Sequence, residues 1–261
     1  MKRWIAVFCV LCMLLSLCAC GEETAVTEEP TTEPVVTEPA STEPPTTEPA
    51  STEPPTTEAP DPYRVVENKV QIYQVSSGTV WALATISVEN TGTENLWMDY
   101  ASITLKDMAG KTVAVMDSVS AYPQILKPGE TGYYCDTIAL DLAELATLIA
   151  FMEADIRPTE KEAQRYTFSN VTLTDTSFGG ILLEGTVNND TETAGELVCI
   201  SAILLDETGG TLGFISGYLD QTLAAGESKS FSYESFMLPE GLDTRFISSY
   251  VLFAFPADET P

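Results

Sequence analysis

The stretch VWALATISVEN, residues Val80–Asn90, decides the fold class of this chain. Its apolar side chains recur at every second position, Ala82, Ala84, Ile86 and Val88, and the polar side chains Thr85, Ser87 and Glu89 fill the alternate positions. Because successive side chains of a β-strand point to opposite faces, this alternation predicts a half-buried strand. The tripeptide Asn90-Thr91-Gly92 that closes it predicts a turn.

A second alternating run lies a few residues downstream and also ends at a turn. Ala101, Ile103 and Leu105 alternate with polar neighbours, and the run is followed by Asp107-Met108-Ala109-Gly110. Short alternating runs separated by Gly, Asn and Asp continue from Tyr63 onward, which is typical of an all-β protein.

The same pattern recurs in the second half of the chain. Asn189 corresponds to Asn90 and Asp206 to Asp107, each at an offset of 99 (206 − 107 = 99). A Gly-Glu turn that ends at Glu130 recurs at Glu227, at an offset of 97 (227 − 130 = 97). Near-constant spacing indicates a duplicated module of about 100 residues, the size of an immunoglobulin-like sandwich. We therefore expect two such β-sandwiches in tandem, at 63–157 and 158–261.

Two pentapeptides in these copies carry a resemblance to a known family. Ile103-Thr104-Leu105-Lys106-Asp107 and Ala202-Ile203-Leu204-Leu205-Asp206 keep the Leu and Asp of the FxLYD motif and lack its Phe and Tyr. The chain resembles FxLYD-type and related immunoglobulin-like domains, which occur in tandem on bacterial surface lipoproteins. This resemblance covers both modules and implies the sandwich fold, and the family offers no catalytic residues to carry over.

The start of the chain has the layout of a secretory signal. Lys2 and Arg3 precede an apolar run, Trp4–Leu17, that is shorter than the roughly 20 residues of a membrane span. Leu17-Cys18-Ala19-Cys20 resembles a bacterial lipobox. This resemblance implies removal of residues 1–19 and lipidation of Cys20, which would anchor the chain outside the cytoplasm at the cell surface. The alternative is an uncleaved or ordinarily secreted chain.

Residues 20–62 lack the apolar and aromatic side chains that a folded core requires. Ala40–Pro49 is repeated almost unchanged from Ala50, and Pro and Glu recur throughout. This composition predicts a disordered, semi-rigid stalk that reaches on the order of 100 Å when extended. Alternative roles for the stalk are binding of a proline-reading domain and glycosylation of its threonines.

Composition argues against several function classes. The chain has 39 acidic and 12 basic residues, so we expect no nucleic-acid partner. Histidine is absent, which rules out Ser-His-Asp triads and histidine zinc ligands. Cys135 and Cys199 are expected as buried free thiols. Because acids such as Asp107, Asp190 and Asp206 sit at predicted turns, we expect them to bond to nearby backbone. The chain is predicted to be no enzyme, with no cofactor and no metal.

Strand parity singles out apolar side chains on nominally outer faces. It places Trp97 on the inward face with Ile103, and Trp81 and Leu83 on the outward face of their strand. The outward face of the second module is also apolar, at Leu197, Cys199, Ile203 and Leu205. Such a face marks either packing between the modules or a partner surface. The candidate partner surface comprises Trp81, Leu83, Leu197, Ile203 and Leu205.

Helical signal is limited to two short segments. Asp141–Leu148 and Leu238–Leu242 each predict one or two helical turns before closing strands at Leu148–Met152 and Tyr250–Phe255. The polar stretch Arg157–Gln164 is interpreted as the link between modules, because Pro158 argues against a continuous strand there.

These patterns favour a non-catalytic cell-surface lipoprotein whose tandem modules bind, or present to, a protein or glycan partner at the envelope. One alternative is a carbohydrate-binding accessory protein or a carboxylate-based glycan hydrolase, recognisable by aligned Trp and Tyr side chains or two facing carboxylates. A purely mechanical spacer is the other alternative.

Overall fold

The computed structural model describes residues 61–75, 78–141, 147–235, 238–239 and 241–257. Over these residues the chain forms antiparallel sheets that make two β-sandwich modules, which confirms the all-β class. Both modules belong to one compact unit. The expected signal sequence, Cys20 and the stalk lie outside the described residues. Within the described ranges no helix has the length and apolar character needed to cross a bilayer.

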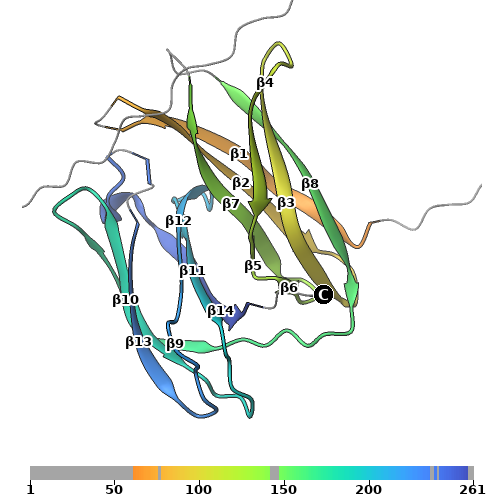
Figure 1. Ribbon diagram of the computed structural model, residues 1–261, viewed down its shortest axis with the longest axis vertical. Helices are drawn as coiled ribbons and strands as arrows, with labels where there is room; N and C mark the ends of the chain where they lie inside the picture. The colour runs from red at the N-terminus through yellow and green to blue at the C-terminus, as the bar shows by residue number, and fades with distance from the viewer. Residues whose placement is uncertain (1–60, 76–77, 142–146, 236–237, 240, 258–261) are drawn as a thin grey trace, which may run out of the picture. The chain divides into compact units, whose positions relative to one another are not determined.

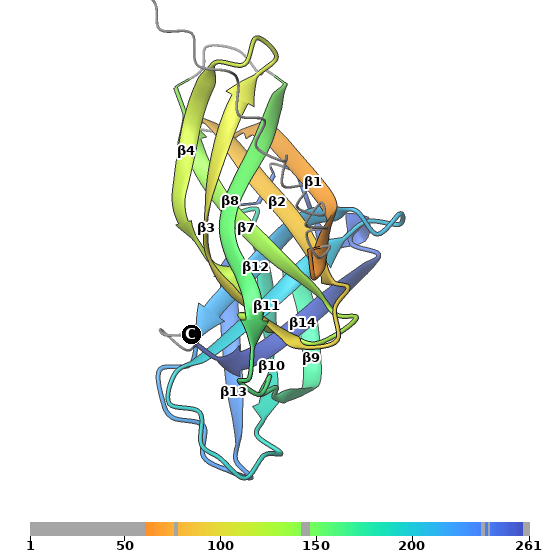
Figure 2. The same ribbon diagram turned by 90° about the vertical axis from the view of Figure 1, so that its right-hand side faces the viewer.

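The first module consists of two layers (Figure 1). One layer has the order β1-β2-β7-β5, with β1 (Tyr63–Gln74), β2 (Val80–Asn90), β7 (Thr131–Leu140) and β5 (Ala121–Tyr122). The other layer contains β4 (Thr112–Val119), β3 (Asn95–Asp107), β6 (Ile125–Leu126) and β8 (Leu148–Thr159), and β8 pairs along β3. Figure 2 shows β4, β3 and β8 running side by side.

The core of the first module lies between these layers, where the sequence pattern predicts it. The inward set of β2, Ala82, Ala84, Ile86 and Val88, is almost completely buried against Ile103 and Leu105 of β3. Burial of such apolar side chains contributes about 1.5–3 kcal/mol each for the larger ones.

The second module repeats this arrangement with fewer strands. Its layers are β13-β10-β9 and β12-β11-β14. The bounds are β9 (Thr167–Asp175), β10 (Ile181–Asn188), β11 (Val198–Leu205), β12 (Thr211–Tyr218), β13 (Ser228–Ser235) and β14 (Ser249–Pro256). A separate core fills the space between the layers, with Ile200, Ala202 and Leu204 of β11 at its centre.

A buried asparagine occupies the same place in both modules. Asn90 and Asn189 are each 1% exposed, and each donates through Nδ2 to two backbone carbonyls. The acceptors are Glu94 and Leu126 in the first module, at 2.8 and 2.9 Å, and Thr193 and Leu223 in the second, at 2.8 and 3.0 Å. Matching hydrogen bonds at the predicted offsets show that the two modules share one construction.

The aspartate turns are equivalent as well. Asp107 Oδ1 accepts from the N–H groups of Ala109 and Lys111, and Asp206 Oδ1 accepts from those of Thr208 and Gly210. Hydrogen bonds from Thr208 and Gly210 lower the pKa of Asp206. The predicted turn role of these two acids is confirmed.

Asp190 departs from that prediction. Its carboxylate accepts from the Thr167 hydroxyl, which is a side-chain contact rather than a local backbone contact. The neighbouring turn is instead held by Asn189, whose Oδ1 accepts from the Thr191 N–H at 3.0 Å.

The link between the modules was predicted to begin at Arg157, which is before the last strand of the first module ends. Strand β8 continues to Thr159, with Pro158 opposite Leu96 of β3, so the expected boundary between residues 157 and 158 falls inside a strand. Proline is tolerated there because β8 pairs only with β3 in the described part of the chain, and the missing N–H of an edge strand breaks no ladder.

The two predicted helical segments have different outcomes. In Asp141–Leu148, residues 142–146 lie outside the described residues. In Leu238–Leu242, residue 240 lies outside the described residues. The Leu242 N–H donates to Pro239 O at 3.0 Å, and a 3₁₀ segment, η1 (Thr244–Phe246), follows Leu242. The closing strands predicted after these segments are confirmed as β8 and β14.

Candidate ligand-binding groove at the module junction

The outer face of the first module's β2-β7 layer packs against the outer face of the second module's β11-β14 layer. We call the buried side chains between them the interface cluster: Tyr122, Tyr133, Cys135, Cys199, Ile203, Phe253 and Phe255. The Tyr133 and Phe253 rings lie 6.1 Å apart between centroids, within the range of favourable aromatic pairs. The two modules are therefore joined by a hydrophobic core of their own.

A group of hydrogen bonds, which we call the polar clasp, joins the first module to Thr211 of the second. Thr211, which is fully buried, donates its N–H and hydroxyl to the Glu67 carboxylate at 3.2 and 2.7 Å. Lys69 Nζ and Gln71 Nε2 donate to the Thr211 carbonyl at 2.6 and 3.0 Å. Since several of these hydrogen bonds involve charged groups, they are stronger than neutral ones and fix the register of the two modules.

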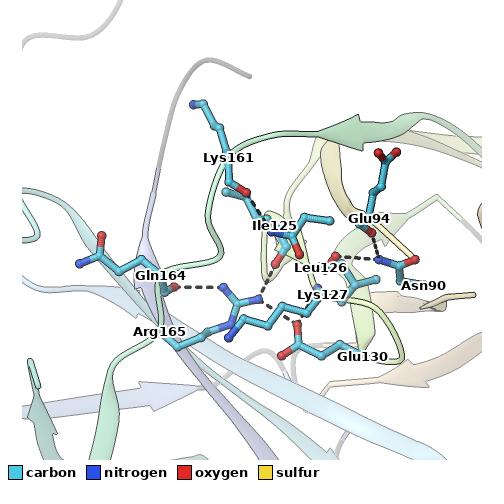
Figure 3. Close-up of polar contacts among 10 residues, drawn as sticks. Asn90, Glu94, Ile125, Leu126, Lys127, Glu130, Lys161, Gln164 and Arg165 are labelled. Atoms are coloured by element: carbon cyan, nitrogen blue, oxygen red, sulfur yellow. Dashed lines mark hydrogen bonds and ion pairs between the residues drawn. The ribbon is translucent and has the colours of Figure 1, made fainter. Parts of the chain in front are cut away.

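Arg165 joins the link to the first module (Figure 3). Its guanidinium donates to the carbonyls of Gln164 and Ile125 and to Glu130 Oε2. Glu130 also accepts from the Lys127 N–H at 2.9 Å, so the same carboxylate shapes its own turn and holds the link. Burial lowers the pKa of Arg165, and the nearby Glu130 carboxylate opposes that shift.

Two of the five residues of the predicted partner surface take part in this module contact. Leu83 and Ile203 are fully buried, and Leu205 packs against the interface cluster. Trp81 is partly buried on β2. Of the two alternatives that the sequence left open, packing between the modules holds for Ile203 and Leu205. Leu197 differs, because it remains 42% exposed.

The prediction for Trp97 is wrong. The register of β3 against β8 shifts between Met98 and Ala101, and this bulge reverses the parity of the residues before it. Met98 enters the first core, whereas the Trp97 side chain turns toward the link, where Lys161 Nζ lies 4.9 Å from its ring centroid. Trp97 Nε1 is buried and has no acceptor among the described residues.

A cavity of about 470 Å³ opens beside Trp97, and we call it the junction groove. Its volume falls within the range of ordinary small-molecule sites. Both modules and the link contribute to its wall, through Trp97, Gln124, Ile125, Glu162, Gln164, Arg165, Ala194, Gly195, Glu196, Leu197, Phe255, Pro256 and Ala257. No single module could form this groove.

A smaller cavity of about 140 Å³ continues the junction groove. The two share Gln124, Leu197, Phe255 and Ala257. Its wall adds three tyrosines, Tyr100, Tyr122 and Tyr218, so we call it the aromatic hollow. Sequence reasoning missed these tyrosines because Tyr100 lies within the β3 bulge and Tyr218 at a strand end, where parity gives no guidance.

The two thiols of the interface cluster are unreactive near neutral pH. Cys135 and Cys199 are buried free thiols, as predicted, and burial raises the pKa of each to about 12. Both therefore stay protonated near neutral pH and are poor nucleophiles. Within the described ranges, no group of three or more Cys, Asp or Glu side chains is placed to hold a metal ion.

Comparison with known proteins does not assign this chain to a family. No protein family and no curated protein matches the sequence. A calcium-binding mutant of Bacteroides uniformis beta-glucuronidase 2 aligns at 14% identity over 65% of this chain and 23% of that chain, with a TM-score of 0.23. A chaperone-tip adhesin complex of CFA/I fimbriae aligns at 12% identity over 64% of this chain and 88% of that chain, with a TM-score of 0.16. Scores this low carry no argument about function.

Proposed function

We propose that this chain is a non-catalytic cell-surface lipoprotein that binds an envelope or extracellular protein or glycan partner in the junction groove. The observation that carries the proposal is the composite wall of the groove, to which Trp97, Arg165 and Leu197 come from the first module, the link and the second module. A spacer needs no such cavity, whereas a binding site benefits from walls that are rigid before the ligand arrives. The hydrogen bonds around Thr211 and those of Arg165 supply that rigidity.

The anchoring part of the proposal rests on the sequence alone. Leu17-Cys18-Ala19-Cys20 ends an apolar signal, and lipidation of Cys20 would hold the modules at the membrane beyond the stalk. The resemblance to FxLYD-type domains of surface lipoproteins supports the same placement. We expect Cys20→Ala to move the protein from the membrane fraction to the soluble extracytoplasmic fraction. Unchanged membrane retention would contradict lipid anchoring.

The binding part is tested with a matched pair of substitutions in the full chain. Leu197 on the groove and Ile149 on the outer face of β8 are exposed to the same degree, 42% and 43%. Leu197→Arg introduces charge and bulk into the groove, and Ile149→Arg makes the same change outside it.

Immobilised wild-type, L197R and I149R proteins are exposed to envelope proteins and glycans, and the bound material is quantified. We expect L197R to lose a component that wild type and I149R both retain. If all three retain the same material, the groove is not the binding site. If none retains anything reproducible, the chain is a mechanical spacer.

A second candidate, sugar binding or hydrolysis, is favoured by a shallow hollow of about 650 Å³ on the outer face of the first module. Tyr100 borders it together with the carboxylates Asp117, Glu153 and Asp155. If this hollow is the functional site, the chain should retain or cleave envelope glycan, and Glu153→Gln should abolish that activity. Release of reducing ends measures cleavage.

A further inference from the structure

The aromatic hollow has a rim and a floor of different exposure. Tyr100 and Tyr218 form the rim, with 51% and 49% of their surfaces exposed, and each comes from a different module. Tyr122 and Phe255 form the floor, at 7% and 3% exposure. Proximity of Tyr100 adds to the burial that raises the pKa of Tyr218. Four aromatic side chains thus surround a space the size of a single side chain.

Negative charge flanks the hollow on both sides. Tyr100 also borders the shallow hollow that contains Asp117, Glu153 and Asp155. On the opposite side, Leu197 leads into the junction groove, where Glu162 and Glu196 lie. The wall of the aromatic hollow itself includes no Lys or Arg among the described residues.

The basic side chains nearest to this region are engaged elsewhere. Lys161 lies over the Trp97 ring, and Arg165 is held by Glu130 and two carbonyls. Arg157 forms an ion pair with Asp155, so the net negative charge of the shallow hollow comes from Asp117 and Glu153. The ring faces and these flanking carboxylates both attract a cation.

We propose that the aromatic hollow binds the guanidinium group of an arginine in a basic, extended peptide segment of the partner, an inference that rests on the proposed binding function. Guanidinium is planar and weakly hydrated, so it stacks on aromatic faces and bonds carboxylates through two N–H groups. Flanking basic residues of the same segment would lie along the carboxylates of the junction groove and of the shallow hollow.

Two other occupants are disfavoured by charge. The stalk of this chain carries Glu at regular intervals and no Lys or Arg between Gly21 and Pro60. A second copy of the chain is equally unsuitable, because the formal net charge is −27. Like charges of this size repel both from an acidic groove.

The experiment uses the full chain and a synthetic arginine-rich peptide in isothermal titration calorimetry at about 0.15 M ionic strength, where long-range attraction is screened. A peptide of equal length with citrulline in place of arginine is the neutral counterpart. We expect the citrulline peptide to bind at least about 10-fold more weakly. Tyr100→Ala and Tyr218→Ala should each weaken arginine-peptide binding by about 3- to 10-fold, the range of a cation–π contact.

Tyr250→Ala is the matched control, since Tyr250 is 38% exposed and lies outside the hollow. All three substitutions leave the net charge unchanged, so a difference among them reports the rings rather than the field of the protein. Equal affinity for the arginine and citrulline peptides would overturn the proposal. Equal affinities of Y100A, Y218A and Y250A for the arginine peptide would also overturn it, because general attraction would then account for binding.

The ligand class and the binding function fail in distinguishable ways. If L197R retains all the envelope material that wild type retains, the binding function itself fails. If retention depends on Leu197 but excess arginine peptide does not compete with it, only the arginine assignment fails. Retention of a glycan that is lost in Y100A and Y218A, without peptide binding, would replace the peptide by a glycan.

Discussion

The two modules use one strand face in opposite ways. Ile203 of β11 and Thr104 of β3 are equivalent positions at an offset of 99 (203 − 104 = 99), and they pair with Val251 and Phe151 respectively. Ile203 is buried against the first module, whereas Thr104 and its same-face neighbours Ser102 and Lys106 are only partly buried. The next pair of equivalent positions is Leu205 of β11 and Lys106 of β3 (205 − 106 = 99). Leu205 packs against the interface cluster, whereas Lys106 lies over the Phe151 ring of its own module.

The opposite layers show the reverse pattern. Thr85 of β2 lies beside Cys135 in the buried interface, and its equivalent on β10, Glu184, lies beside Ser232 on an exposed face. A duplicated fold therefore does not decide which face becomes an interface. A few side chains per face do so, because only an apolar face gains free energy when another sheet covers it.

The largest effect is expected from a charge placed on the covered face. Ile203→Asp buries a carboxylate without a partner and should lower the free energy of unfolding by at least about 3 kcal/mol. Thr104→Asp makes the same change at the partly exposed equivalent position and should cost less, about 1 kcal/mol. Urea denaturation followed by tryptophan fluorescence measures both. Similar losses would show that the two faces are not distinguished by burial.

The buried asparagines test the symmetry of the modules. Asn90→Ala and Asn189→Ala each leave two backbone carbonyls, one of them buried, without their side-chain donor, at a cost of about 2 kcal/mol. Because the hydrogen bonds match, we expect the two losses to agree within about 1 kcal/mol. A large loss of unfolding free energy for only one of the two variants would show that the modules are alike in backbone structure but not in the energetic role of this asparagine. The measurement is again the urea denaturation midpoint.

The last expected effect is a dependence of the free energy of unfolding on alkaline pH, and it arises at the interface. Burial raises the pKa of Cys135 and Cys199 from 9.0 to about 12, so the folded state retains protons that the unfolded state has lost. Their stabilisation is complete below about pH 9 and is lost as the pH rises to about 12. Urea midpoints at pH 8, 9.5 and 11 measure the slope.

Cys199→Ala is the control for this dependence and should reduce the slope by about one thiol's share. Several buried tyrosines also have raised pKa values, including Tyr73 and Tyr233 at about 12, so part of the slope remains in the variant. An unchanged slope would show that Cys199 does not remain protonated in the folded state.

Some features were predictable because they depend on neighbouring residues only. The strand Val80–Asn90, its inward apolar set and the turn chemistry of Asp107 and Asp206 are local properties of the chain, and the structure agrees with each of them. The prediction that this strand is half-buried is wrong, because Thr85 and Ser87 on its other face are buried as well. The burial of Cys135 and Cys199 also followed from composition, since a free cysteine favours the interior.

Other features were not predictable because they depend on parts of the chain that are distant in sequence. The bulge between Met98 and Ala101 reverses the side on which Trp97 lies, and no periodicity reports a single extra residue. Leu83 was assigned to an outward face correctly by parity, yet it is fully buried, and the alternation within β2 does not report that burial.

The sequence by itself determined the strands, their turns and the duplication of the module, because a period of two and the hydrogen bonding of Asn and Asp are written in adjacent residues. Tertiary structure alone decided the interface cluster, the junction groove and the aromatic hollow. Each of these brings together residues that are distant in sequence, such as Cys135 and Phe253 in the interface cluster, Trp97 and Leu197 in the junction groove, and Tyr100 and Tyr218 in the aromatic hollow. Such contacts exist only after two folded sheets have met, because the free energy of packing belongs to the pair of faces and not to either one.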